Sequence, residues 1–272
     1  MDATIPFSFV LGHMITIPVN VNGKEDKFIF DTGIGLTLIS KRIADSPKLK
    51  YDGSFVGKRM SGQEVSINLT RISSLGVGTV EAREVAVGVF DIPGLPSDIG
   101  GILSPGFLKG TIFTVNYESN ELILRQKNSA IEDICDSIVP IEVVRNGSSV
   151  TIFINVDLPI GKQVKLEVDT GSSVLILNSS LMEELSISKE GPQTEVFNGT
   201  DETGNSYTRY FSKIKGRVAI AGADDVFYTN PEAIFQNIIY DGLLGNEFLK
   251  HYNVTYDLLH KKMGFSQFDS IE

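Results

Sequence analysis

The chain has 272 residues, enough for one sizeable core or for two domains of ordinary size. Apolar residues make up 42% and charged residues 21%, a balance typical of folded globular proteins and not of disordered ones. The formal net charge of -10 argues against nucleic acid or an anionic membrane as a partner, because both require a basic surface.

Cysteine and histidine usage limits the chemistry further. The single cysteine, Cys135, excludes an internal disulfide, and His13, His251 and His260 are too scattered to indicate a metal site. We therefore expect no metal and no cofactor. No apolar run reaches membrane-spanning length, and the N-terminus lacks a signal-peptide pattern. The compartment stays open: a soluble cytoplasmic protein if the chain is complete, a periplasmic or secreted one if it is a mature fragment.

Short alternating apolar runs predict β-strands throughout the first half. Val, Ile and Thr are common, and the 26 glycines and ten prolines favour tight turns. Strands are expected over residues 5–10, 15–21, 28–30, 75–78 and 85–90, a strand running into a short helix over 101–109, and two strands around an Asn120 turn within 115–124. An Asn22-Gly23 turn and a hairpin with its tip near Ser61 complete this half.

The second half repeats this order. Residues 150–156 parallel residues 15–21, and a Gly/Asn-rich stretch from Asn198 to Ser206 stands where the first hairpin tip stood. Helical candidates are few and short, at Ser40–Asp45 and Ser180–Leu185. The sequence therefore predicts an all-β protein.

Each half carries an Asp-Thr-Gly turn directly after an apolar strand, at Asp31 and at Asp169. A segment that begins with Gly101 follows the first turn at nearly the same distance as one that begins with Gly242 follows the second. Matching motifs in matching order indicate an internal duplication. We expect an N-terminal lobe over 1–124, a linker over 125–137 and a C-terminal lobe over 138–272.

Two similar halves that pack about a pseudo-twofold axis would bring the two Asp turns together. Two carboxyls at close range cannot both ionise, so they share one proton. The ionised member can then deprotonate a water while the protonated member donates to a substrate carbonyl. The two Thr hydroxyls could tie the turns together, and Gly33 and Gly171 let the backbone approach substrate closely. Hairpins over the cleft would hold an extended peptide by main-chain hydrogen bonds.

These motifs resemble those of the aspartic proteases. The resemblance covers nearly the whole chain, with one retropepsin-like unit in each half, and the segment Gly242 to Leu249 is especially similar to the closing motif of the bacterial retropepsin-like aspartyl proteases. It implies a bilobal, pepsin-like arrangement of two retropepsin-like β-barrel lobes. It also implies the site residues: Asp31 and Asp169 as the catalytic dyad, Thr32 and Thr170 as the crossed hydroxyl pair beneath it, Ser172 as a supporting residue, and Met60, Ser61 and Gly62 with the two glycines as substrate-binding residues.

The N-terminal half departs from the family pattern at two positions. Ile34 follows the first Asp-Thr-Gly where the family has Ser, Thr or Ala, and Ser104 replaces a glycine of the closing motif. Because Ile34 offers Asp31 no side-chain donor, we hypothesise that Asp31 is the more easily protonated carboxyl and that Asp169 carries the charge.

The sequence predicts a monomeric aspartic endopeptidase that cleaves extended peptides or proteins, with apolar side chains around the scissile bond and fastest cleavage below neutral pH. One alternative is a degenerate protease that serves as a binding module, and another is a purely structural β-sandwich. A third is an ATPase of the actin and sugar-kinase type, which also carries duplicated Asp turns but needs long helices. The simplest alternative is that Asp-Thr-Gly occurs twice only because Asp and Gly are favoured in tight turns.

Overall fold

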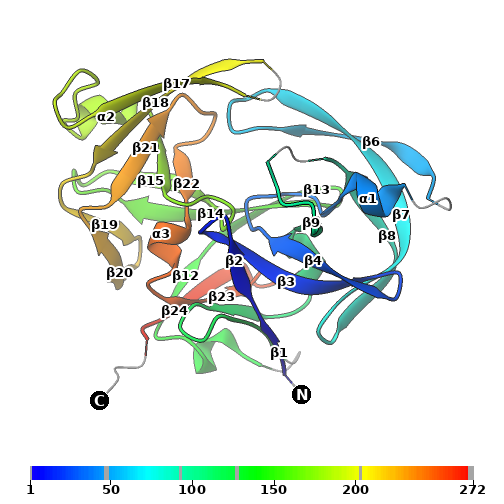
Figure 1. Ribbon diagram of the computed structural model, residues 1–272. Helices are drawn as coiled ribbons and strands as arrows, with labels where there is room; N and C mark the ends of the chain where they lie inside the picture. The colour runs from blue at the N-terminus through cyan, green and yellow to red at the C-terminus, as the bar shows by residue number, and fades with distance from the viewer. Residues whose placement is uncertain (1, 46–48, 92–93, 126–128, 202–203, 269–272) are drawn as a thin grey trace.

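The computed structural model describes residues 2–45, 49–91, 94–125, 129–201 and 204–268. Over these residues the chain is mostly β-structure, arranged as two lobes above a shared sheet (Figure 1). The predicted all-β, two-lobed fold is confirmed.

The N-terminal lobe is built on an eight-stranded sheet with the order β2-β3-β4-β9-β5-β8-β7-β6. Its elements are β2 (Ser8–Val10), β3 (Met14–Val21), β4 (Lys24–Phe30), β5 (Leu38–Ile39), α1 (Lys41–Ala44), β6 (Tyr51–Lys58), β7 (Glu64–Val77), β8 (Val80–Val89), β9 (Ile99–Leu103) and the 3-10 helix η1 (Pro105–Leu108). The predicted Asn22-Gly23 turn joins β3 to β4, with positive φ at both residues (52° and 82°). Because β4 pairs in parallel with β9, the first Asp turn at the end of β4 lies beside the segment that begins at Gly101.

The C-terminal lobe is built on a ten-stranded sheet in which the same neighbours recur. Its elements are β13 (Glu142–Asn146), β14 (Ser149–Asp157), β15 (Gln163–Val168), β16 (Leu175–Asn178), α2 (Leu181–Glu184), β17 (Glu195–Thr200), β18 (Ser206–Lys213), β19 (Arg217–Ile220), β20 (Ala223–Thr229), β21 (Glu232–Gln236), β22 (Gly242–Leu244) and α3 (Asn246–Leu249). The strand before the second Asp turn, β15, pairs in parallel with β22, as β4 does with β9. The two Asp turns therefore have the same surroundings in the backbone.

A six-stranded sheet joins the lobes, with the order β1-β11-β10-β23-β24-β12. Its strands are β1 (Ala3–Pro6), β10 (Phe113–Asn116), β11 (Glu121–Leu124), β12 (Ser137–Pro140), β23 (Asn253–Asp257) and β24 (Lys262–Ser266), and the 3-10 helix η2 (Ile131–Asp133) precedes β12. At the β10–β23 junction Phe113 stacks on Tyr256 with ring centroids 4.8 Å apart, and the Thr114 and Thr255 hydroxyls are 2.8 Å apart. Strands from both ends of the chain thus fix one lobe against the other. Part of the predicted linker, residues 126–128, lies outside the described residues.

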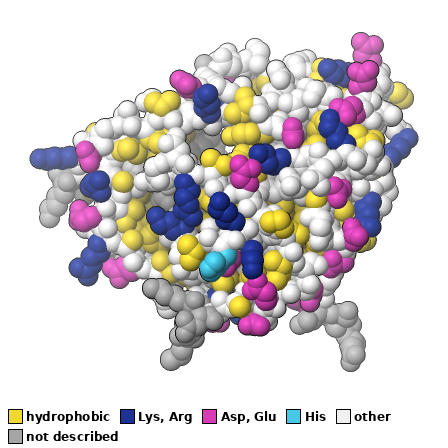
Figure 2. Space-filling model, turned by 180° about the vertical axis from the view of Figure 1, so that it is seen from behind, with side chains coloured by type: hydrophobic (Ala, Val, Ile, Leu, Met, Phe, Trp, Pro, Cys, Tyr) yellow, Lys and Arg dark blue, Asp and Glu magenta, His cyan; other side chains and the backbone are white. Residues whose placement is uncertain are grey.

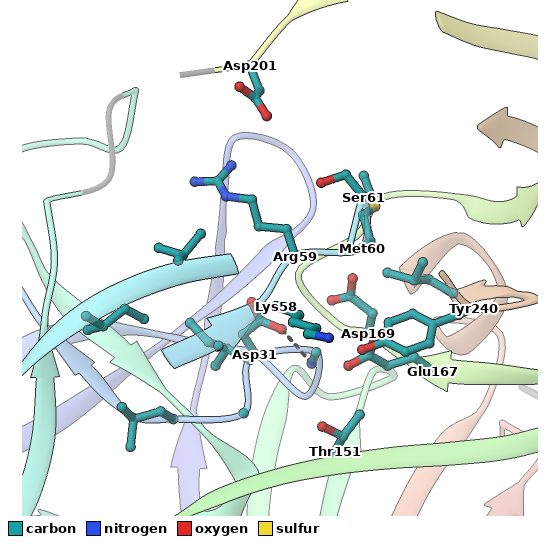
Figure 3. Close-up of a pocket in the computed structure, with 18 of the residues that line it drawn as sticks. Asp31, Lys58, Arg59, Met60, Ser61, Thr151, Glu167, Asp169, Asp201 and Tyr240 are labelled. Carbon is teal, nitrogen blue, oxygen red and sulfur yellow. Dashed lines mark hydrogen bonds between the residues drawn. The ribbon is translucent and has the colours of Figure 1, made fainter. Parts of the chain in front are cut away.

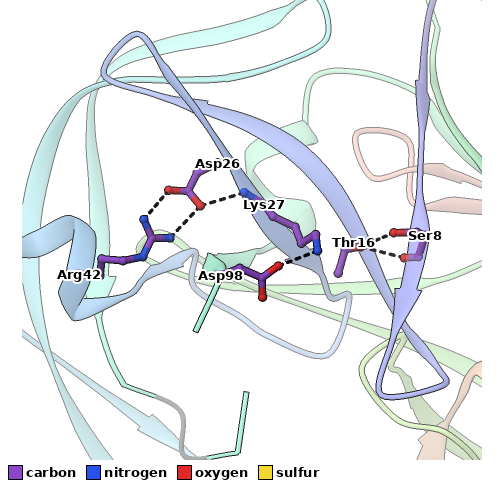
Figure 4. A network of polar contacts seen from close by, with 6 residues as sticks. All are labelled: Ser8, Thr16, Asp26, Lys27, Arg42 and Asp98. Atoms are coloured by element: carbon purple, nitrogen blue, oxygen red, sulfur yellow. Dashed lines mark hydrogen bonds and ion pairs between the residues drawn. The ribbon is translucent and has the colours of Figure 1, made fainter. Parts of the chain in front are cut away.

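A polar network lies on α1 and the strands beside it, away from the cleft (Figure 4). The Arg42 guanidinium donates two hydrogen bonds to the Asp26 carboxylate (2.8 and 3.0 Å), and the Lys27 ammonium lies 2.8 Å from Asp98. Because Asp26 and Lys27 belong to β4, the bidentate Arg42 pair fixes α1 against the strand that carries the first Asp turn.

Helices contribute little to the described structure. Each of α1, α2 and α3 spans four residues, so the long helices that an ATPase of the actin type requires do not cover these sheets. No helix in the described part of the chain is long and apolar enough to cross a membrane.

Candidate active site

Both aspartates are placed by the strand that precedes them and the closing segment beside it. The Asp31 N–H donates to the Leu103 carbonyl (3.1 Å), and the Asp169 N–H donates to the Leu244 carbonyl (3.0 Å). These contacts continue the parallel β4–β9 and β15–β22 ladders by one residue. Each carboxyl group is therefore held at the end of a fully paired, buried strand.

The two turns are tied together by their threonines, which are fully buried. The Thr32 hydroxyl donates to the Val168 carbonyl (2.8 Å) and accepts from the Thr170 N–H (3.0 Å). The Thr170 hydroxyl donates to the Phe30 carbonyl (3.1 Å) and accepts from the Thr32 N–H (3.0 Å). The structure thus brings Thr32 and Thr170 into the crossed arrangement expected for them.

The carboxyl groups of Asp31 and Asp169 meet across this junction. They are close enough to hydrogen-bond to each other, and each also packs on the glycine of the opposite turn. A Cβ on Gly33 would lie 2.4 Å from Asp169 Oδ1, and a Cβ on Gly171 would lie 2.4 Å from Asp31 Oδ2. Glycine is thus required at both positions by this close approach.

Burial raises the pKa of both carboxyls above the ordinary value of aspartate. For Asp169 the negative charges of Asp31 and of Glu167 add to burial, and its pKa is raised well above that value. Both carboxyls accept backbone N–H donors that oppose the effect of burial on the pKa, from Gly33 and Ile34 at Asp31 and from Gly171 at Asp169, so the added negative charge of Glu167 is what distinguishes Asp169. The structure therefore favours Asp169 as the protonated member, the reverse of the assignment made from the sequence.

The assignment made from the sequence compared side chains, whereas backbone N–H groups supply donors to both aspartates. Ser172 does contact Asp169, but through its N–H (3.1 Å), while its hydroxyl donates to the Val174 carbonyl (3.2 Å). Its hydroxyl thus gives Asp169 no advantage over Asp31.

A cleft of about 930 Å³ lies over the two aspartates and is lined by both lobes (Figure 3). This volume is within the range of sites that bind small organic ligands and short peptide segments. The wall from the N-terminal lobe is mainly apolar: Ile34, Leu36, Leu38, Phe55, Ile67 and Phe90. The wall from the C-terminal lobe is mainly polar: Ser149, Thr151, Glu167, Arg209, Gln236 and Tyr240. The expectation of a generally apolar cleft is correct for one wall only.

Two hairpins border the cleft. The tip of the β6–β7 hairpin contributes Met60 and Ser61 to the lining, and the Met60 carbonyl accepts a hydrogen bond from the Ile239 N–H of the C-terminal lobe (2.8 Å). Gly62 lies at the same tip with φ of 85°, and a Cβ there would lie 2.8 Å from Ile239. The β17–β18 hairpin contributes Thr200 and Ser206 from its two strands; residues 202–203 of its predicted tip lie outside the described residues.

The predicted substrate-binding residues thus divide into two groups. Gly33, Met60 and Ser61 line the cleft, whereas Gly171 lies against Asp31 and Gly62 lies against Ile239.

Two residues of the site were missed from the sequence. Glu167 lies on the same face of β15 as Asp169, and the alternation of the strand is the signal that could have found it. The buried Asn246 amide donates to the Thr170 carbonyl (2.5 Å) and to the His13 carbonyl (2.8 Å), and it accepts from the Tyr117 hydroxyl (2.6 Å). It connects the second Asp turn to the N-terminal lobe, and nothing local in the sequence indicates this.

Figure 2 shows acidic and basic side chains interspersed with apolar ones on the face opposite to Figure 1, and a hollow in the upper part of the molecule.

Comparison with known proteins supplies one match. The family model described as aspartyl protease matches residues 17–107, which run from β3 through the first Asp turn to η1. The comparison with curated proteins gave no match. The match lies within the N-terminal lobe, and the C-terminal lobe repeats the strand pairings of that lobe around its own Asp turn. The N-terminal lobe is thus similar in sequence to the aspartyl proteases, and the all-β, two-lobed fold of the chain agrees with a retropepsin-like aspartic protease.

Proposed function

We propose that the protein is an aspartic endopeptidase in which Asp31 and Asp169 are the catalytic dyad. The observation that carries this proposal is the direct approach of two partly buried carboxyl groups, one from each lobe, at the floor of a cleft. Both catalytic groups come from one chain, so a monomer suffices. We further propose that the lobes, 1–124 and 138–272, arose by duplication, which the recurrence of the β4–β9 pairing as β15–β22 supports.

The mechanism follows from the unequal environments of the two acids. Asp31, the ionised member, takes a proton from a water, and the water oxygen bonds to the carbonyl carbon of the scissile peptide. Asp169 gives its proton to the carbonyl oxygen, which produces a neutral gem-diol. One diol hydroxyl then returns its proton to Asp169, the proton on Asp31 passes to the amide nitrogen, and the C–N bond breaks. The products are a carboxylic acid and an amine, and each aspartate regains its starting protonation state.

Activity should therefore require one proton on the dyad. Because the pKa of Asp169 is raised well above that of an ordinary aspartate, the dyad keeps this proton at pH values where a solvent-exposed carboxyl would have lost it. Cleavage should be fastest below neutral pH and should fall as the pH rises through that pKa. Activity that keeps increasing into the alkaline range would exclude the shared-proton mechanism.

The test is digestion of a peptide library with and without pepstatin, which resembles the transition state of the family. The proposal expects cleavage that pepstatin blocks and that falls by at least about a hundredfold in the separate Asp31→Asn and Asp169→Asn variants. Circular dichroism of each variant should match the wild type. Absence of cleavage by correctly folded wild-type protein over pH 3 to 8 would favour the alternative, a protease-like binding module.

A further inference from the structure

Glu167 is a third carboxyl group at the dyad, and the mechanism does not use it. It precedes Asp169 by two residues on β15, so both side chains leave the same face of the strand. The residue is 6% exposed, and it nevertheless lines the cleft. Figure 3 shows Glu167 beside Tyr240, on the side of the cleft that carries Asp169.

Glu167 forms no salt bridge with a described residue, although Lys58 and Arg59 line the same cleft from the N-terminal lobe. Burial and the negative charge of Asp31 raise the pKa of Glu167 to about 8, and no basic group opposes them. The lysine on the same face of β15, Lys165, lies 2.8 Å from Glu142 and 5.4 Å from the centre of the Phe153 ring. On the same wall, Arg209 donates to Gln236 (2.9 Å) and lies over the Tyr207 ring (4.7 Å).

Although the wall that carries Glu167 is mainly polar, the residues next to Glu167 include aromatic and aliphatic side chains, which suit a long aliphatic side chain. Its neighbours in the sheet register are Phe153 on β14 and Leu243 on β22, and Tyr240 packs edge-on against Phe153 with centroids 5.4 Å apart. Lysine and arginine side chains combine such a stem with a charged tip. Because a nearby cation favours the ionised form of a carboxyl group, a bound lysine or arginine would lower the pKa of Glu167 and form an ion pair with it.

The N-terminal lobe has a different residue at the equivalent position. Ile29 precedes Asp31 by two residues, is 1% exposed, and packs with Leu36 and Leu38 in an apolar cluster beside the cleft. One side of the dyad is therefore acidic and the other apolar. The two substrate side chains that flank the scissile bond would meet different surroundings.

We propose that Glu167 is a specificity-determining residue, which selects a lysine or arginine side chain of the substrate next to the scissile bond, on the side of the C-terminal lobe. This inference rests on the proposed endopeptidase function. It narrows the substrates to peptides with a basic residue on one side of the cleaved bond and an apolar residue on the other.

The first test measures kcat/KM for peptides that differ at a single position, which holds lysine, norleucine or glutamate, on each side of the bond in turn. The wild type should prefer lysine to norleucine by about tenfold or more at one of the two positions and should reject glutamate there. Glu167→Gln, which keeps the shape and removes the charge, should bring the lysine and norleucine peptides within about twofold of each other. Glu183→Gln, an equal change of charge at an exposed residue of α2, should leave the preference intact. A wild type without lysine preference, or a Glu167→Gln variant that retains it, overturns the inference.

A second test separates this inference from the proposed function. It measures the binding of two uncleavable hydroxyethylene peptides, one with lysine and one with norleucine at the selected position. Tighter binding of the lysine peptide by about tenfold, lost in Glu167→Gln, supports the role of Glu167 even if the protein cleaves no peptide. Equal affinities in the wild type overturn it even if the protein is an active protease.

Discussion

Ile29 and Glu167 occupy equivalent positions in the two lobes, each two residues before the aspartate of its turn, yet one is apolar and the other is a carboxylic acid. The backbone around them is alike, since β4 pairs with β9 as β15 pairs with β22. The threonine hydrogen bonds that join the turns are also matched within 0.3 Å, from 2.8 Å to 3.1 Å. The strand pairings and the threonine hydrogen bonds that hold the dyad are thus the same in both lobes. The side chains that face the cleft differ between the lobes.

The closing segments differ in a second way. Ser104 and Pro105 of the N-terminal lobe stand where the C-terminal lobe has Gly245 and Asn246. The Asn246 amide forms a hydrogen bond between the lobes, to the His13 carbonyl. The Ser104 hydroxyl instead donates within its own lobe, to the Gly35 carbonyl (2.9 Å). The two segments thus hold the same strand end by different side-chain contacts.

The largest expected effect concerns Glu167 and the pH dependence of stability. Its pKa rises from 4.5 to about 8 on folding, so the folded state holds this proton more tightly than the unfolded chain does. Glu167 therefore lowers the free energy of unfolding as the pH rises from about 4.5 to about 8, by an amount on the order of 4 kcal/mol. Urea denaturation at pH 4.5 and pH 8 should show a loss that is greater in the wild type than in Glu167→Gln by about this amount, because the raised pKa values of the dyad contribute to the loss in both proteins. The exposed Glu183→Gln serves as the control, and an unchanged pH dependence in Glu167→Gln would contradict the burial of an ionisable Glu167.

The second prediction tests the matched threonine hydrogen bonds. Thr32→Val and Thr170→Val each remove a hydroxyl that makes two buried hydrogen bonds, and each leaves one N–H and one carbonyl unsatisfied. Each should lower the free energy of unfolding by about 3 kcal/mol, and the two losses should agree within about 1 kcal/mol. Thr32→Ser and Thr170→Ser keep the hydroxyl and should cost about 1 kcal/mol. A large loss of unfolding free energy in one of these two valine variants and none in the other would show that the two threonines do not contribute equally to the junction of the turns.

The sequence alone predicts the turns and closing segments that hold the dyad, because these elements depend on local sequence signals. The Asp-Thr-Gly turns, the Asn22-Gly23 turn and the closing segments at Gly101 and Gly242 all lie where their residue types predict them. Each of these depends on residues that are adjacent in the chain or that recur in both halves.

The features of the site that were not predicted from the sequence depend on contacts between distant segments of the chain. Strand alternation places Glu167 on the same face as Asp169, but its burial depends on the neighbouring strands β14 and β22, which the sequence does not pair with β15. The Asn246 amide meets the His13 carbonyl from the other end of the chain. The assignment of the shared proton to Asp31 took no account of the negative charge of Glu167, which the fold buries beside Asp169 and which raises the pKa of that carboxyl.

The third prediction tests the asymmetry of the closing segments. Asn246→Ala removes three hydrogen bonds at a residue that is 3% exposed, including those to Thr170 and to His13. It should cost about 2–3 kcal/mol of unfolding free energy, and kcat should fall because the second Asp turn loses a contact that positions it. Pro105→Ala at the equivalent position of the N-terminal lobe should cost about 1 kcal/mol or less. If Asn246→Ala lowers the free energy of unfolding no more than Pro105→Ala does, the hydrogen bonds of Asn246 do not help to hold the lobes together, and the shared sheet alone does so.

The smallest expected effect belongs to Ser104. Its hydroxyl accepts from the Gly106 N–H (3.2 Å) at the start of η1 and donates to Gly35, so it caps a short helix and fixes the loop after the first Asp turn. The C-terminal lobe has no room for such a residue, because a Cβ on Gly245 would lie 2.3 Å from the Val174 carbonyl oxygen. Ser104→Ala should lower the free energy of unfolding by about 1 kcal/mol and leave the pH profile of cleavage unchanged. A shift of that profile in Ser104→Ala would instead mean that the serine reaches the dyad through the Gly35 loop, and that the departure from the family glycine serves the chemistry of Asp31.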